Sequence, residues 1–455
     1  MMKFNRNFLY GCCCLALTAQ AADNDLAGQM SGSDPFSVNA KVAPGVTGYL
    51  DRNCAIPRTV MSLTDVIDVA LCNNPQTRTA WANARVAAAQ VGSAQSAYLP
   101  TVNGTAGISH DRSVLTGLTA TNRNLGLSIN YLLFDFGARS AQRDAAQATL
   151  EAANRNQDQA VNTVYLAVVQ AYYQYFAAQA QVDALHEAES SAKSSFDAAN
   201  ARYQAGTNTR ADVLQAQTAY SQARLATLRG EGDLRVAQGV LANAMGWDAD
   251  HALNLSGSAD DVMPRDLVGN VRDLILQAQQ QRPDLQAAAA QLRAAQAQVR
   301  AKEAAGKPAL SLTGNTSYQD NGSFNGNGSS LGVAVNVPIF TGFNSTYQIR
   351  AAQAQANAQE AQQAQLSNQV ALDVWRAWQN LATETAALDA TADLIRSATA
   401  SAEMALGRYR AGVGNILDVL TAQSSLASAR SQRVQAQYNW RIAKVALAQA
   451  IGHLE

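Results

Sequence analysis

Four short segments of this sequence alternate apolar and polar residues with a period of two, which is the pattern of β-strands with one apolar face. The clearest of them are residues 124–133 and 331–337. Loops rich in Gly, Asn, Ser and Thr separate the segments within each pair. The pattern therefore predicts two β-hairpins, at residues 101–134 and 309–340.

Each predicted strand is about ten residues long, which suits a tilted strand that crosses a membrane with lipid on one side and a polar lumen on the other. The same alternation also fits a half-buried hairpin on the sheet of a water-soluble protein. Alternation is a weak signal by itself, so the strands alone leave both interpretations open.

Two very long segments lack strong helix breakers. Residues 138–205 contain no Pro or Gly, and residues 344–411 contain only Gly407. A helix of this length measures about 100 Å, more than a globular core can cover, so each must pack along other helices. Ser62 and Asp65 have the spacing of a capping box that starts a shorter helix. The shorter helices are predicted at about 62–98, 209–246, 270–306 and 415–451.

The sequence contains an internal duplication, which is visible as motifs separated by a constant 206 residues. The segment 202–206 (RYQAG) recurs as 408–412 (RYRAG), and 212–214 (DVL) recurs as 418–420. Repeats of this kind indicate two copies of one structural unit. We divide the chain into a first repeat, an Asp-, Gly- and Ser-rich equatorial linker and a second repeat, at residues 62–246, 247–269 and 270–453.

Membrane-spanning strands would force the chain to form an oligomer. Unpaired backbone groups in lipid cost several kcal/mol each, so a sheet cannot keep open edges there. Four strands are too few for a closed barrel, whose practical minimum is about eight. A dimer would supply eight strands and a trimer twelve, and the spacing does not choose between them.

The N-terminus has the features of an export signal. Basic residues precede a short apolar run, and residues 19–21 have the small-x-small form of a cleavage site. We assign residues 1–21 to a signal peptide and 22–61 to an N-terminal extension. A short buried helix and a lipoprotein signal cleaved before Cys12 are the alternatives.

Export also bears on the cysteines, because exported proteins meet an oxidising compartment. The predicted mature chain keeps only Cys54 and Cys72. A disulfide between them is predicted, and two free thiols are the alternative.

Composition and charge exclude several classes of function. With 34 basic and 35 acidic residues the net charge is −1, so nucleic acid is not an expected partner. No internal run of 18 apolar residues follows the signal, and the four histidines are scattered without metal-ligand spacing. No phosphate-binding loop or nucleophile–base pair is present. We therefore expect no enzyme activity, cofactor or metal site, and any energy for transport must come from a partner.

The duplicated unit, the segment 336–340 (NVPIF) followed by Gly342, and the two RYxAG…DVL motifs together resemble the TolC-like family of outer-membrane efflux and type I secretion channels. The likeness covers about residues 60–453. It implies a mainly α fold with a small β part: an internally duplicated long-helix α-barrel, plus four membrane β-strands per chain that close a 12-stranded β-barrel in a homotrimer. It also implies a passive exit channel in the outer-membrane lipid, with a helical barrel in the periplasm. Its implied partners are a periplasmic adaptor protein and an inner-membrane ABC exporter or proton-driven pump.

By the same resemblance, two glycine turns form the periplasmic tip, where adaptor hairpins make contact. The tip turns and expected adaptor contacts are Arg202, Gly206, Arg408 and Gly412. The resemblance implies that Asp212 and Tyr409 help to hold the closed state by hydrogen bonding, and that Asp418 contributes to an acidic ring. Two family residues are replaced here, by Thr421 and Gly414, which predicts a weaker ring and the loss of one ion pair.

Simpler roles compete with these assignments. Thr209 and Asn415 precede the aspartates at the spacing of helix N-caps, so capping alone is one interpretation of Asp212 and Asp418. Gly206 and Gly412 fit helix ends with positive φ. For the whole chain, the alternative function is a secreted periplasmic coiled-coil scaffold without channel activity.

Overall fold

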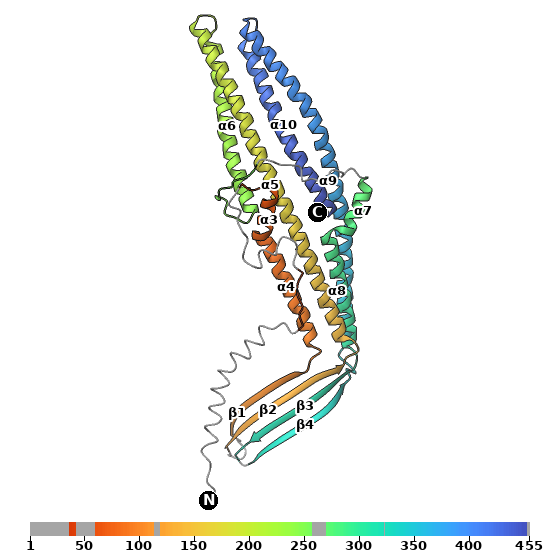
Figure 1. Ribbon diagram of the computed structural model, residues 1–455. Coiled ribbons are helices and arrows are strands. Elements are labelled where there is room, and N and C mark those ends of the chain that lie inside the picture. The colour runs from red at the N-terminus through yellow and green to blue at the C-terminus, as the bar shows by residue number, and fades with distance from the viewer. Residues whose placement is uncertain (1–35, 42–59, 113–118, 257–269, 323, 453–455) are drawn as a thin grey trace. The chain divides into compact units, whose positions relative to one another are not determined.

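The computed structural model describes residues 36–41, 60–112, 119–256, 270–322 and 324–452 (Figure 1). The predicted signal peptide lies outside these residues, as does most of the N-terminal extension and of the linker 247–269. The chain divides into two compact units. One holds the β-sheet with the helix segments 85–96, 138–147 and 300–305, and the other holds the remaining helices.

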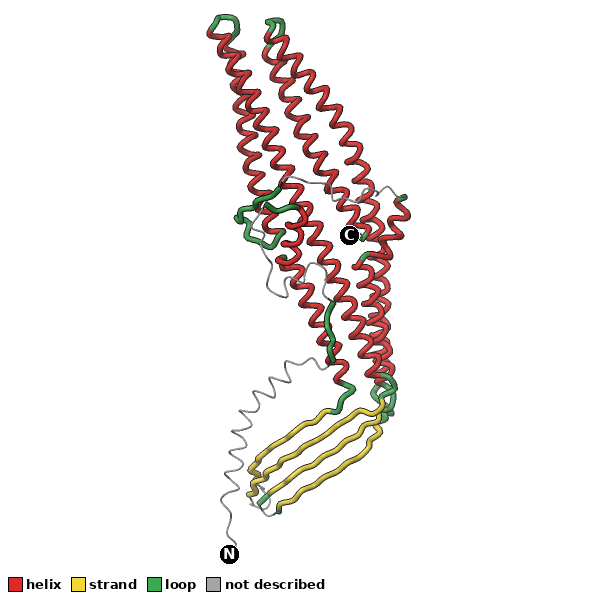
Figure 2. The backbone as a smooth tube through the Cα atoms, viewed as in Figure 1, coloured by secondary structure: helices red, strands yellow, loops and turns green. Residues whose placement is uncertain are grey.

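The sheet has four antiparallel strands in the order β1-β2-β3-β4 (Figure 2). Their bounds are Thr101–Arg112, Thr119–Phe134, Ala309–Asp320 and Asn325–Asn336. The two hairpins, one from each repeat, join through β2 and β3, where Leu125 pairs with Tyr318 and Ile129 with Gly314. The duplicated sequence therefore builds one continuous sheet rather than two separate hairpins.

One face of this sheet is apolar and uncovered in the single chain. Large apolar side chains on it are solvent-exposed: Leu331 is 79% exposed, Val333 62% and Leu125 60%. A hairpin on a water-soluble sheet would bury such side chains, because exposed apolar patches of this size are rare on soluble monomers. Strands β1 and β4 also have only one neighbour each. The sheet is therefore complete only with lipid on one face and further strands at its edges.

The two longest helices are α5 (Ala138–Gln204) and α9 (Asn344–Arg410), each of 67 residues. Each turns back into a shorter helix, α6 (Arg210–Ala244) or α10 (Ile416–Ile451). Alanines make up much of the buried surface between these helices, and their small side chains let helices approach closely. None of the described helices is both long and apolar enough to cross a membrane.

The first helix of each repeat is broken in two, so the predictions of single helices over 62–98 and 270–306 are wrong. The first repeat has α3 (Leu63–Asn73) and α4 (Pro75–Ser96). The second has α7 (Val271–Gln281) and α8 (Pro283–Ala305). A proline disfavours helical backbone in the residue before it. Accordingly Asn74 has ψ 129° and Arg282 has ψ 126°.

Polar side chains at the two breaks bind the returning helices. In the first repeat, Asn74 Nδ2 donates to the carbonyl of Ala244 at 3.0 Å. In the second, buried Arg282 pairs with Asp284 at 2.6 Å and donates to the carbonyl of Ala450 at 3.4 Å. Each break therefore anchors the C-terminal end of α6 or α10.

An apolar core surrounds the helix break of each repeat. The first core gathers aromatic and aliphatic side chains from α3, α5 and α6, among them the buried Tyr172 and Tyr173, together with Val445 of α10. The second joins α7, α9 and α10, with Val370, Val374 and Leu447 fully buried. Most of the remaining helix length is packed through alanines, so these cores are the main apolar anchors of the helices.

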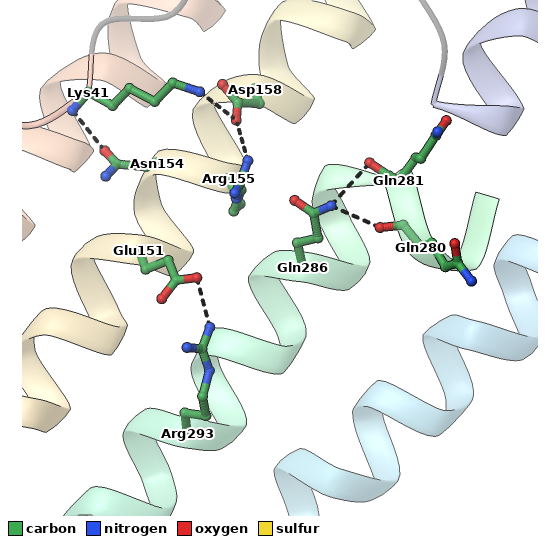
Figure 3. A network of polar contacts seen from close by, with 9 residues as sticks. All are labelled: Lys41, Glu151, Asn154, Arg155, Asp158, Gln280, Gln281, Gln286 and Arg293. Carbon is green, nitrogen blue, oxygen red and sulfur yellow. Dashed lines mark hydrogen bonds and ion pairs between the residues drawn. The ribbon is translucent and has the colours of Figure 1, made fainter. Parts of the chain in front are cut away.

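Polar contacts join the two repeats along α5. Glu151 of α5 pairs with Arg293 of α8 at 2.8 Å, beside contacts of Lys41 with Asp158 and Asn154 (Figure 3). Toward the other end of α5, residues of α10 bind it through the pairs Ser431–Gln181, Arg430–Glu187 and Ser195–Gln423. The polar contacts across the seam are thus few and widely spaced, and Val445 of α10 adds an apolar contact with the core of the first repeat.

The capping box of α3 generates a stability prediction. The Ser62 N–H and hydroxyl both donate to the carboxylate of Asp65, at 2.8 and 2.7 Å, and these bonds hold the pKa of Asp65 below its ordinary value. We expect Ser62→Ala to destabilise the start of α3 by about 1 kcal/mol, seen as faster hydrogen exchange of residues 63–66. Because the pKa of Asp65 is lowered on folding, this contribution is present at neutral pH and is lost as the pH falls through that pKa.

The control is Ser93→Ala, at an exposed position inside α4, which should leave exchange near residue 62 unchanged. Equal exchange in wild type and Ser62→Ala at neutral pH would contradict the assignment.

Candidate functional site: the helical tips

The turns from α5 to α6 and from α9 to α10 end their helices in the same way. Gly206 has φ 75° and Gly412 has φ 77°, a left-handed backbone that glycine adopts without steric cost. The N–H of Thr207 donates to the carbonyl of Arg202, and that of Val413 to the carbonyl of Arg408, at 2.9 and 3.0 Å. These bonds form the helix-terminating motif that the sequence predicts for both glycines.

The helix that follows the first turn begins with a reciprocal capping box. Thr209 Oγ1 accepts from the Asp212 N–H at 3.3 Å, while the Asp212 carboxylate accepts from the Thr209 N–H at 3.0 Å and from its hydroxyl at 2.9 Å. Asp212 is therefore engaged in capping within its own chain.

The second turn caps its helix in a different way. The Asn415 side chain accepts from the Asp418 N–H at 2.7 Å. The Asp418 carboxylate is exposed and makes no hydrogen bond or ion pair to any described residue. Asp418 thus presents a solvated negative charge beside the second turn, whereas Asp212 does not.

Side chains of the first tip reach the second tip and hold it. Asn208 Nδ2 donates to the hydroxyl of Tyr409 at 3.0 Å, and the Arg202 guanidinium lies 4.3 Å from the centre of the Tyr409 ring. Arg202 also donates to the carbonyl of Arg410 at 3.1 Å. We call Arg202, Asn208, Tyr409 and the Arg410 carbonyl the tip bridge.

The tip bridge covers a small apolar core. Tyr409 is only 4% exposed and packs with Ala199, Ala216, Ile416 and Val419. A cation over an aromatic face contributes about 0.5–1 kcal/mol at an exposed site, and a neutral hydrogen bond about 1 kcal/mol. The bridge is therefore a modest restraint on the two tips.

The structure brings together only some of the predicted tip residues. Arg202 and Tyr409 are in contact, whereas Asp212 and Tyr409 have different partners within the chain. Arg408 is exposed. At Gly414 an added Cβ would lie 3.1 Å from the Tyr409 backbone nitrogen, so this tight turn leaves little room for a side chain there.

Sequence reasoning missed Asn208, which donates the central hydrogen bond of the bridge. A signal was present, because the 206-residue offset aligns Asn208 with Gly414 and Gln204 with Arg410. The two tips differ at these equivalent positions although their turn motifs match. Such differences mark where one repeat has acquired a contact that the other lacks.

Only one cysteine of the predicted disulfide lies among the described residues. Cys72 is buried and disulfide-bonded. Cys54 lies outside the described residues, so the Cys54–Cys72 pairing stays a prediction.

Comparison with known proteins identifies the family. The family model described as outer membrane efflux protein matches residues 66–247 and 274–453, one segment in each repeat. The chain is 34% identical over 407 residues to Protein CyaE of Bordetella pertussis, covering 87% of this chain and 84% of that protein. It is 29% identical over 402 residues to the outer membrane efflux protein BepC of Brucella suis, covering 86% of each.

A solved structure has the same fold. The crystal structure of CusC, described in connection with transmembrane channel formation, superposes with a TM-score of 0.78 at 21% identity and covers 86% of this chain and 92% of that one.

The match of both repeats to one family model, together with an uncovered apolar sheet face, favours the channel over a secreted scaffold. The chain therefore belongs to the outer membrane efflux protein family, and it is an outer-membrane export channel with a helical barrel in the periplasm.

Proposed function

We propose that three copies of this chain form one passive exit duct, whose periplasmic entrance is the ring of tips and opens when a periplasmic adaptor and an inner-membrane pump engage it. The observation that carries the proposal is the sheet with an exposed apolar face and two edge strands that lack a second neighbour. In lipid such edges must be paired. Three copies supply twelve strands, which are enough to close a barrel.

A surface on α6 supports the contact between copies. Large apolar side chains, each about half exposed or more, recur along it at helical spacing, and Val236 is 66% exposed. Ser221 and Gly232 continue the same stripe with small side chains. Stripes of this kind bury themselves against another helix, and we assign this one to a helix of the neighbouring copy. Its apolar members are Leu214, Leu225, Leu228, Val236 and Val240.

The tips supply the regulated element of the proposal. The tip bridge ties the two helical hairpins of one copy together, and its hydrogen bonds and cation–π contact are individually weak. Arg202 and Arg408 lie next to the glycine turns, where an adaptor would make its contacts. An adaptor that binds the tips better when they are apart would shift the equilibrium toward the open state. The cargo moves passively, and the pump supplies the energy.

Assembly and conductance test the proposed function. Purified mature protein should migrate as a trimer that dissociates on heating, and should give discrete conductance steps in planar lipid bilayers. A stable, water-soluble monomer without conductance would contradict the duct and favour a scaffold.

Removing the Tyr409 hydroxyl tests the tip bridge. Tyr409→Phe deletes the acceptor for Asn208 while it keeps the ring under Arg202. Loss of one neutral hydrogen bond costs about 1 kcal/mol, so we expect roughly fivefold more time in larger conductance levels. The matched control is Tyr203→Phe, the equivalent position of the first repeat, where the tyrosine side chain is 44% exposed. Equal single-channel records for both variants and wild type would show that the tip bridge has no role in gating.

Asp418 generates a separate prediction. Three exposed Asp418 carboxylates that converge near one axis repel one another and attract cations. Multivalent cations added on the tip side should therefore block the channel, and Asp418→Ala should relieve that block at least tenfold. Asp212→Ala serves as the comparison, because the Asp212 carboxylate is occupied by Thr209. Unchanged block in Asp418→Ala would exclude this role.

A further inference from the structure

The apolar face of the sheet carries a hollow of about 540 Å³. Two adjacent rows of side chains on this face flank it. The first row consists of Gly104, Leu127 and Thr316 and the second of Ala106, Leu125, Tyr318 and Asn327. Between the rows, residues whose side chains point to the opposite face contribute backbone to the floor. These floor residues are Thr105, Gly126 and Ser317.

Small residues on β1 create the depth of the hollow. Gly104 and Ala106 lie opposite Leu127 and Leu125. Large apolar side chains therefore border the hollow on β2, and small residues border it on β1. A Cβ added at Gly104 would meet no atom within 4 Å. The hollow is therefore open, apolar and able to take a flexible hydrocarbon chain, whose burial contributes about 0.8 kcal/mol per methylene.

The same face becomes cationic beyond the hollow. The cationic rows lie at the hairpin ends of the strands, opposite to the ends that connect to the helices. The next rows place Arg123 beside Ile108, then His110 opposite Thr121, and then Arg112 opposite Thr119. Arg123 lies 3.8 Å from Asp320, yet its side chain is 66% exposed. Arg112 is exposed and has no ion pair with the described residues.

Two guanidinium groups at the border of an apolar band match the chemistry of a lipid phosphate, which arginine binds through two parallel hydrogen bonds. The strand ends that carry them face the cell exterior, because the helices at the other ends are periplasmic. Hydroxyl and amide groups lie on the same face of β3 and β4, with Asn325 in the row of Arg123 and Asp320, and Tyr318 and Asn327 in the row of Leu125. These groups suit sugar hydroxyls, which an ordinary phospholipid lacks.

We propose that the hollow and the cationic rows form one binding site for a phosphate-bearing, acylated glycolipid of the outer leaflet. An acyl chain occupies the hollow beside Gly104 and Ala106. Arg112 and Arg123 bind a phosphate, and the polar groups of β3 and β4 contact the sugar. The site rests on the proposed function, since it requires this face of the sheet to be turned to lipid in the assembled trimer.

The test is lipid binding by the purified trimer, measured by native mass spectrometry with hexa-acylated lipid A in bisphosphorylated and phosphate-free forms. The double variant Arg112→Gln/Arg123→Gln should lose at least tenfold in affinity for the bisphosphorylated form, because charge-assisted hydrogen bonds are lost. Its affinity for the phosphate-free form should stay unchanged. Gly104→Leu fills the hollow and should weaken both forms about tenfold, as the loss of roughly two buried methylenes would do.

Matched controls separate the site from general effects. Gly332→Leu adds the same side chain to the polar face of the sheet, where a Cβ also meets no atom within 4 Å. Arg396→Gln removes an exposed, ion-paired arginine from α9. Both controls should bind lipid A as the wild type does.

The outcomes distinguish this proposal from the duct itself. Wild-type affinity in the double variant, or equally tight binding of phosphatidylglycerol, would overturn the glycolipid site while the trimer mass and conductance persist. Absence of a trimer in the wild type would overturn the proposed function, and the site with it.

Discussion

The pairing of backbone hydrogen-bonding groups at the sheet edges is the constraint on which the structure depends. Each unpaired N–H or C=O in lipid costs several kcal/mol, and β1 and β4 each carry a full row of them on one side. No rearrangement inside one chain removes these edges, because all four described strands already pair in sequence order. Shared closure by several copies is the solution that satisfies every group, so assembly is a condition of membrane insertion.

Duplication lets one chain supply two hairpins to that assembly, and local substitutions then make the two repeats differ in their side-chain contacts. Both repeats use a proline to break their first helix, yet the neutral Asn74 anchors one break and the buried, ion-paired Arg282 anchors the other. Both tips use a left-handed glycine. Only the first tip has Asn208 to reach across, and only the second has a solvated carboxylate at Asp418. The two tips share their backbone turns, and the unequal side chains determine which contacts each tip makes.

Much of the fold could be predicted from the sequence because it depends on local patterns. Alternation in residues such as 125–133 identifies strands, and the lack of Pro and Gly over 138–205 identifies a continuous helix. Pro75 and Pro283 also indicate the two helix breaks, because a proline disfavours helical backbone in the residue before it. The helical periodicity on both sides of each proline nevertheless favours one uninterrupted helix. The contact of Asn208 with Tyr409 could not be predicted in this way. It joins residues 201 positions apart, and neither residue type nor spacing specifies such a partner.

The two functional regions differ in how many weak interactions must break for them to move. The sheet is held by three ladders of backbone bonds, with one irregularity between β2 and β3 near Phe134, so separating any pair of strands requires many bonds to break together. In the tip bridge, one side-chain hydrogen bond to Tyr409, one to a backbone carbonyl and one cation–π contact hold two helical hairpins. Together these contribute a few kcal/mol at most, in addition to the small apolar core beneath them. Separating the tips therefore requires far fewer interactions to break than separating two strands, and the difference follows from the number of backbone bonds at each place.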